Sequence, residues 1–80
     1  MTIENIQENI AEILAKVLNT DSVELNTTTT AQDIEGWDSI TNVTLISEIE
    51  KHFNIKFKLR EILKFKNVGE LCSSVLKKLV

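Results

Sequence analysis

The sequence predicts an all-α fold, a small antiparallel four-helix bundle with three long helices, one short helix and a long first loop. The chain has 80 residues with no proline and only two glycines, whereas β folds with many tight turns depend on both residue types. Apolar residues also recur at helical spacing in three long segments. Because a chain of this length has room for one hydrophobic core, we expect a single domain over residues 1–80.

The first helix is expected over residues 3–18, where apolar side chains recur at steps of one, three and four. They form one stripe: Ile3, Ile6, Ile10, Ile13, Leu14, Val17 and Leu18. Thr2 is a suitable cap, and Glu4 lies in the first turn, where a carboxylate interacts favourably with the helix dipole. Residues 19–35 lose the helical period, so a long loop is predicted there. Its apolar anchors are Val23, Leu25 and Ile34.

The second helix is expected to begin after Asp38, a favoured N-cap residue, and to end near Asn54. The apolar series assigned to its core-facing stripe is Ile40, Val43, Ile46, Ile49 and Phe53. Residues 55–65 alternate like a strand only briefly and offer no partner strand, so a loop and a short helix are predicted. Asn67 and Glu70 have the spacing of a capping box and open the last helix. Its apolar positions are Val68, Leu71, Cys72, Val75, Leu76 and Leu79.

The formal net charge of −3 conceals a strong asymmetry along the chain. Residues 1–50 contain ten acidic residues and one lysine, a charge of −9, whereas residues 51–80 contain eight basic and two acidic residues, a charge of +6. We expect some of the bases to face the acidic first half within the fold, and the others to distinguish the surface that meets partners.

Composition excludes several classes of function. A self-contained enzyme is not expected, because the chain has one histidine, one cysteine and no zinc-ligand spacing, phosphate loop or nucleophile elbow. His52 is expected near a helix C-terminus and Cys72 in the core. No apolar run approaches a membrane span, and the basic residues lack the aromatic residues or recognition helix of a nucleic-acid site. We expect a cytoplasmic monomer without a metal site.

The start of the second helix is the most informative stretch. If Asp38 caps the helix, Ser39 occupies its first position, with its hydroxyl close to free backbone N–H groups. This environment favours an attached anion such as a phosphate. The alternative is that the Asp-Ser pair only begins a helix.

The surroundings of this pair resemble the acyl carrier protein family over nearly the whole chain. The resemblance is carried by Gly36-Trp37-Asp38-Ser39-Ile40, by Val43, Leu45, Ile46, Ile49 and Phe53, and by Phe65-Lys66-Asn67-Val68. In that family an Asp-Ser-Leu motif opens the second helix, and its serine carries 4′-phosphopantetheine in a phosphodiester. Here Ile40 replaces the leucine and keeps an apolar residue at the base of the arm.

The resemblance implies a role for each matching position. Ser39 matches the modified serine, and Asp38 matches the aspartate that helps to hold the metal of the phosphopantetheinyl transferase. Ile40 and Val43 match apolar residues beside the arm and into the core. The implied function is that of a non-catalytic carrier, which holds acyl groups as thioesters and moves them between acyl-loading, synthase or acyltransferase enzymes.

Two departures from the family pattern point to a specialised carrier. The second helix of fatty-acid carriers is rich in acidic residues, whereas Thr41, Asn42, Thr44 and Ser47 occupy much of it here and Glu48 and Glu50 remain. The usually acidic third-helix region is basic. We therefore expect partner contacts at Trp37, Thr41, Thr44, Leu45 and Glu48, and a polyketide, modified-lipid or surface-glycan pathway rather than housekeeping fatty-acid synthesis.

Several alternatives remain open from the sequence. Trp37 either lines the mouth of the arm or anchors the long loop, and Leu45 either contacts partners or packs under the loop. A peptidyl or aminoacyl carrier would share the fold and the arm. An unmodified helical interaction domain, with Asp38 and Ser39 acting only as a helix start, is a different class of protein.

Overall fold

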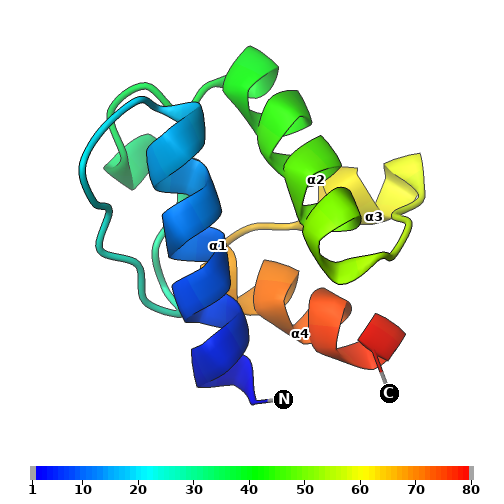
Figure 1. The fold of residues 1–80 in the computed structure, drawn as a ribbon. Coiled ribbons are helices and arrows are strands. Elements are labelled where there is room, and N and C mark those ends of the chain that lie inside the picture. The colour runs from blue at the N-terminus through cyan, green and yellow to red at the C-terminus, as the bar shows by residue number, and fades with distance from the viewer. Residues whose placement is uncertain (1, 80) are drawn as a thin grey trace.

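The computed structural model describes residues 2–79, and its helices confirm the predicted all-α fold. They are α1 (Ile3–Val17), the 3₁₀ turn η1 (Ala31–Asp33), α2 (Ser39–Phe53), α3 (Leu59–Lys64) and α4 (Val68–Leu79). No strand occurs within the described residues. α1 and α2 run in opposite directions, and α4 crosses the lower half of α1 (Figure 1).

The core lies where α1, α2 and α4 meet. Each of these helices contributes a stripe of buried side chains, and α3 contributes none. The fully buried members with the largest side chains are Ile6, Ile10, Leu14, Leu45, Ile49, Val68, Val75 and Cys72. Burial of this apolar surface is the main force that holds the three long helices together.

The predicted core stripe of α2 is wrong at its N-terminal end. Ile40 and Val43 are 77% and 69% exposed, whereas Leu45 is fully buried. A step of three residues falls about 60° short of a full helical turn, so an apolar series at repeated steps of three winds around the helix. Ile49 comes nine positions, or two and a half turns, after Ile40, which places the two residues on opposite sides of α2. The observed stripe is Leu45, Ile46, Ile49 and Phe53.

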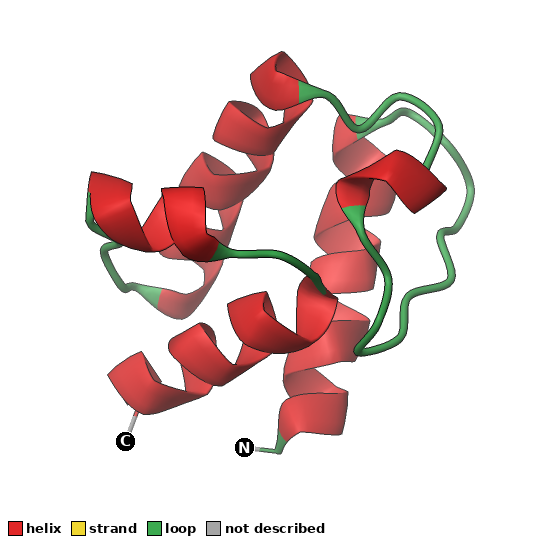
Figure 2. Cartoon of the chain, turned by 180° about the vertical axis from the view of Figure 1, so that it is seen from behind, coloured by secondary structure: helices red, strands yellow, loops and turns green. Residues whose placement is uncertain are grey.

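The long loop descends beside α1, turns near the N-terminus of α4 and returns to α2 (Figure 2). Its predicted anchors, Val23, Leu25 and Ile34, pack against the core as expected. The loop also contains η1, which the sequence analysis did not predict. Because η1 spans only three residues, its hydrophobic period is too short to be recognised.

A compact turn in the loop meets the start of α4. The Asn26 side chain accepts hydrogen bonds from Thr28, and the buried Thr29 hydroxyl accepts one from the Asn26 N–H at 2.9 Å. The carbonyls of Thr27 and Thr29 then accept hydrogen bonds from Gly69 N and Val68 N at 2.9 and 2.8 Å. The turn therefore pairs backbone donors that the helix itself cannot satisfy.

Among the described residues, one ion pair joins the basic second half of the chain to the acidic first half. The described residues contain two ion pairs, of which Lys51–Glu48 joins residues three apart in α2. The other, Lys78–Glu61, has its nitrogen and oxygen 3.0 Å apart and joins α4 to α3. The basic residues around α3 therefore leave their charge at the surface.

Candidate functional site

The N-terminus of α2 has the geometry that its sequence predicts. Asp38 has extended backbone angles, and its carboxylate accepts a hydrogen bond from Thr41 N at 2.8 Å. This hydrogen bond is the main cause of a lowered pKa for the Asp38 carboxyl. Gly36, with φ of +89°, supplies the left-handed backbone just before the helix, and its carbonyl accepts a hydrogen bond from the Thr41 hydroxyl at 2.9 Å.

Ser39 is the first residue of α2 and is exposed. Within residues 2–79 its hydroxyl has no hydrogen-bond partner, although the neighbouring Asp38 and Thr41 side chains both have one. A free hydroxyl at the positive end of a fifteen-residue helix is well placed to carry a negatively charged substituent.

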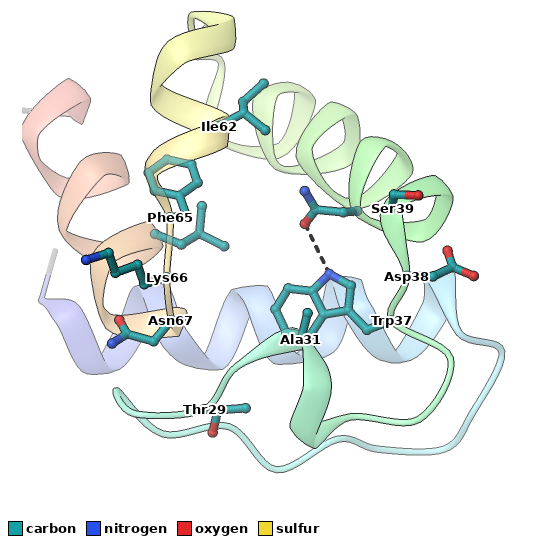
Figure 3. Close-up of a pocket in the computed structure, with 11 residues that line it drawn as sticks. Thr29, Ala31, Trp37, Asp38, Ser39, Ile62, Phe65, Lys66 and Asn67 are labelled. Carbon is teal, nitrogen blue, oxygen red and sulfur yellow. Dashed lines mark hydrogen bonds between the residues drawn. The ribbon is translucent and has the colours of Figure 1, made fainter.

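Trp37 fits both positions considered for it. Its half-buried ring packs against the core, and its indole Nε1 donates a hydrogen bond to Asn42 Oδ1 at 3.0 Å, which ties the end of the loop to α2. The same ring lines the cavity beside Ser39 (Figure 3). The role of Asn42 was not predicted. No sequence pattern indicates that an asparagine side chain accepts a hydrogen bond from a tryptophan five residues earlier.

A cavity of about 280 Å³ lies between the start of α2 and the C-terminal end of α3. Asp38 and Ser39 contribute to its lining on the α2 side, with their oxygen atoms pointing away from Ile62 and Phe65, which line the α3 side (Figure 3). The rest of the lining comes from Thr29, Ala31, Trp37, Asn42, Lys66, Asn67 and Leu71. The predicted serine therefore lies at an opening whose lining is partly apolar and partly polar.

The predicted docking residues divide into two groups. Leu45 is wrong as a docking residue, because it is fully buried and belongs to the core. Thr44 and Glu48 are exposed, and Glu48 lies 3.8 Å from Lys51. Thr41 is half-buried, with its hydroxyl donated to Gly36 O. That Trp37, Thr41, Thr44 and Glu48 contact a partner stays a prediction.

The only histidine and the only cysteine of the chain occupy structural positions. His52 Nε2 lies 3.2 Å from Asn9 Oδ1 and links the last turn of α2 to α1. Cys72 is buried as predicted, and burial raises the pKa of its thiol to about 11, so it is not a thiolate nucleophile at neutral pH. Among residues 2–79, no group of three His, Cys, Asp or Glu side chains is placed to hold a metal ion.

The comparison with protein families matches most of the chain. The family model described as "Phosphopantetheine attachment site" covers residues 8–75, which include the whole of α2 and its cap. The chain belongs to the acyl carrier protein family.

Solved structures of other acyl carrier proteins agree with this assignment. The holo acyl carrier protein of Geobacter metallireducens is 42% identical and has a TM-score of 0.85, over 92% of this chain and 85% of that one. A candidate acyl carrier protein of Mycobacterium tuberculosis is 29% identical with a TM-score of 0.79, over 90% and 96% of the two chains. The acyl carrier protein of Enterococcus faecalis, at 19% identity and a TM-score of 0.72 over 98% and 99%, shares the fold. The search of curated proteins gave no match.

The cofactor of this family is a covalently bound 4′-phosphopantetheine, and the residues of this acyl carrier protein fit it. The family is generally non-catalytic, in keeping with the structural positions of His52 and Cys72. The start of α2 exposes the Ser39 hydroxyl, which has no hydrogen-bond partner among residues 2–79, at the positive end of the helix. Within residues 2–79, no helix is long and apolar enough to cross a membrane.

Proposed function

We propose that Ser39 carries the 4′-phosphopantetheine arm and that the protein moves acyl groups between separate enzymes. The observation that carries the proposal is the exposed Ser39 hydroxyl, unpartnered within residues 2–79, at the capped start of α2, inside the region matched by the phosphopantetheine-attachment family. The phosphodiester would be stabilised by the positive end of the helix.

The roles of the neighbouring residues follow from their geometry. Asp38 holds the first turn through Thr41 N, and its carboxylate is an exposed anion that a transferase-bound metal can recognise. Ile40 is exposed beside Ser39 and offers an apolar surface to the base of the arm. When attached, the arm supplies a terminal thiol that holds the acyl group as a thioester. The chain itself presents and tethers this thiol, and tethering raises the local concentration of the cargo at each enzyme.

The cargo is an acyl group, and the pathway is a specialised one. The solved relatives bear the name acyl carrier protein, which supports acyl over aminoacyl cargo. Threonines 41 and 44 and a basic α3 region replace the acidic surface expected of a housekeeping fatty-acid carrier. Synthesis of a polyketide, a modified lipid or a surface glycan fits this surface better. Phosphopantetheinyl transferase and enzymes that load, extend or transfer acyl groups are the partners, meeting the protein at Trp37, Thr41, Thr44 and Glu48.

Intact-mass spectrometry tests the attachment directly. The wild-type protein is incubated with coenzyme A and a broad-specificity phosphopantetheinyl transferase, and we expect it to gain one phosphopantetheine. Ser39→Ala is expected to gain none, whereas Ser47→Ala, a matched change at another exposed serine of α2, retains the full gain.

Two results would refute the proposal. One is an unmodified wild-type protein, and the other is a Ser39→Ala variant that is still modified. The acyl group itself is identified by mass spectrometry of protein isolated from its native source, where an aminoacyl thioester in place of an acyl one would replace the proposed cargo class.

A further inference from the structure

The segment of residues 56–66 that contains α3 carries an unusual concentration of exposed positive charge. All five of its basic residues are exposed: Lys56, Lys58, Arg60, Lys64 and Lys66. The two ion pairs within residues 2–79 involve none of them. We call residues 56–66 the basic segment. The charges of these five basic residues do not hold the fold together through ion pairs.

The single acid of the basic segment does not cancel this charge. The Glu61 carboxylate accepts hydrogen bonds from Lys58 N at 2.8 Å and from Lys78 Nζ on α4 at 3.0 Å. The backbone N–H of Lys58 is the main cause of a lowered pKa for Glu61, followed by Lys78. Glu61 is therefore paired with a base outside the segment, and the five exposed cations keep their charge.

Two exposed leucines lie among these cations. Leu59 and Leu63 are 71% and 77% exposed and, being four residues apart on α3, occupy the same face of the helix. Unlike these two leucines, Ile62 of the same helix packs against the core. The leucines do not stabilise the folded domain, and a pair of large exposed apolar side chains ringed by charge is typical of an interaction surface.

The basic segment is continuous with the attachment site. Ile62, Phe65 and Lys66 line the same cavity as Ser39 (Figure 3). A molecule seated on α3 therefore lies next to the place where the arm leaves the protein, as an enzyme that acts on the cargo must.

We infer that the basic segment docks a partner enzyme whose active-site entrance carries acidic residues around an apolar pocket that receives Leu59 and Leu63. This inference rests on the proposed attachment of the arm at Ser39. Charge complementarity steers the encounter. The two leucines, once buried in the partner's pocket, supply the apolar contact that slows dissociation. A protein partner fits better than a membrane, because α3 has only six residues and offers two leucines, too little apolar surface for anchoring in a bilayer.

The test uses a synthetic helical peptide with leucines flanked by glutamates on one face, and a second peptide with lysines in place of the glutamates. Each is titrated into ¹⁵N-labelled holo-protein and followed by NMR. We expect the acidic peptide to shift amide signals of residues 56–66 and the lysine peptide to shift none. The paired variant Lys58→Glu/Arg60→Glu is expected to weaken binding by about tenfold or more, and raised salt to weaken it in the wild type.

The matched control is Lys16→Glu/Lys77→Glu, which changes the net charge equally at exposed lysines on α1 and α4 and should leave the affinity within about twofold of the wild type. Leu59→Ala/Leu63→Ala tests the apolar contact and should weaken binding without altering the salt dependence. Circular dichroism confirms that each variant is folded.

Four outcomes would overturn the inference. They are shifts outside the basic segment, equal effects of the two charge-reversal pairs, binding to phosphatidylserine-containing vesicles but not to the acidic peptide, and a dimer in sedimentation that Lys58→Glu/Arg60→Glu dissociates. The last two would assign the surface to a membrane or to a second copy of the chain. Intact mass reports modification of Ser39 separately, so failure of the attachment is distinguishable from failure of docking.

Discussion

The N-termini of α2 and α4 begin with similar capping residues but end up in opposite environments. At α2 the Asp38 carboxylate accepts the Thr41 N–H, and Ser39 is exposed, with no hydrogen-bond partner for its hydroxyl among residues 2–79. At α4 the Asn67 side chain accepts the Glu70 N–H at 2.9 Å, and carbonyls of the long loop accept two further N–H groups. One helix start is open to solvent, and the other is closed by the protein itself.

This difference supports the start of α2, and not that of α4, as the proposed attachment point. A helix N-terminus attracts an anion through its unpaired N–H groups and its dipole. At α4 the donors of Val68, Gly69, Glu70 and Leu71 are all used within the protein. The long loop thus has two effects. Its turn pairs the backbone donors at the start of α4, and its last residues lead directly into Asp38 and Ser39 at the open start of α2.

The largest effect on this comparison is expected from Gly69→Ala, which disturbs the closed end. A Cβ atom on Gly69 would lie 2.8 Å from the Thr27 carbonyl oxygen and 3.1 Å from Thr27 Cβ, so the loop must move away. We expect a loss of about 2 kcal/mol in the free energy of unfolding, even though alanine favours helices more than glycine does. Urea unfolding followed by circular dichroism measures the change.

Ser73→Ala is the control for Gly69→Ala, because Ser73 is exposed on the same helix. It should leave stability unchanged or raise it by a few tenths of a kcal/mol. If Gly69→Ala is as stable as Ser73→Ala, the loop does not close α4 as tightly as the hydrogen bonds of Val68 and Gly69 indicate.

A smaller loss is expected from Trp37→Phe, which loosens the loop at the open end. The change removes the hydrogen bond from the indole N–H to Asn42 Oδ1 but keeps an aromatic ring in the half-buried position. We expect a loss of about 1 kcal/mol in the free energy of unfolding. A double-mutant cycle with Asn42→Ala isolates the contribution of the hydrogen bond. Purely additive losses would show that the indole anchors the loop by packing alone.

The sequence predicted the open end better than the closed one, for a physical reason. Asp38 and Ser39 act through neighbours within three residues, so their spacing alone indicates a capped helix start. The closed end depends on Thr27 and Thr29, which lie about forty residues before Val68 and act through backbone carbonyls. Carbonyls leave no trace in side-chain identity, and the threonine run indicated only a loop.

The errors along α2 have a similar origin in local reasoning. The positions of the helices were predictable because capping residues and hydrophobic period are local signals. Which side of α2 faces the core depends on its neighbours. Ile40 and Val43 were assigned to the core-facing stripe but are exposed, and Leu45, which the sequence left open between partner contact and packing, is buried. The predicted docking role of Leu45 is wrong for this reason. The position of Ile40 beside the arm stays a prediction, with which its exposure is compatible.

The smallest effect on stability is expected from the charge of Asp38, the cap of α2. Asn67, the cap of α4, is neutral. The pKa of Asp38 is lowered from 3.8 in the folded protein, so its charge stabilises the fold above that pH, and the stabilisation is lost as the pH falls through the lowered value. Asp38→Asn keeps a good N-cap but removes the charge. The variant should melt below the wild type at pH 6, and the gap should close as the pH falls through the lowered pKa of Asp38. Asn67→Ser, which exchanges one neutral cap of α4 for another, should show an offset that does not change with pH. Thermal melts from pH 6 to pH 2.5 measure both gaps, and a constant gap for Asp38→Asn would mean that the cap acts by shape, with no contribution from its charge.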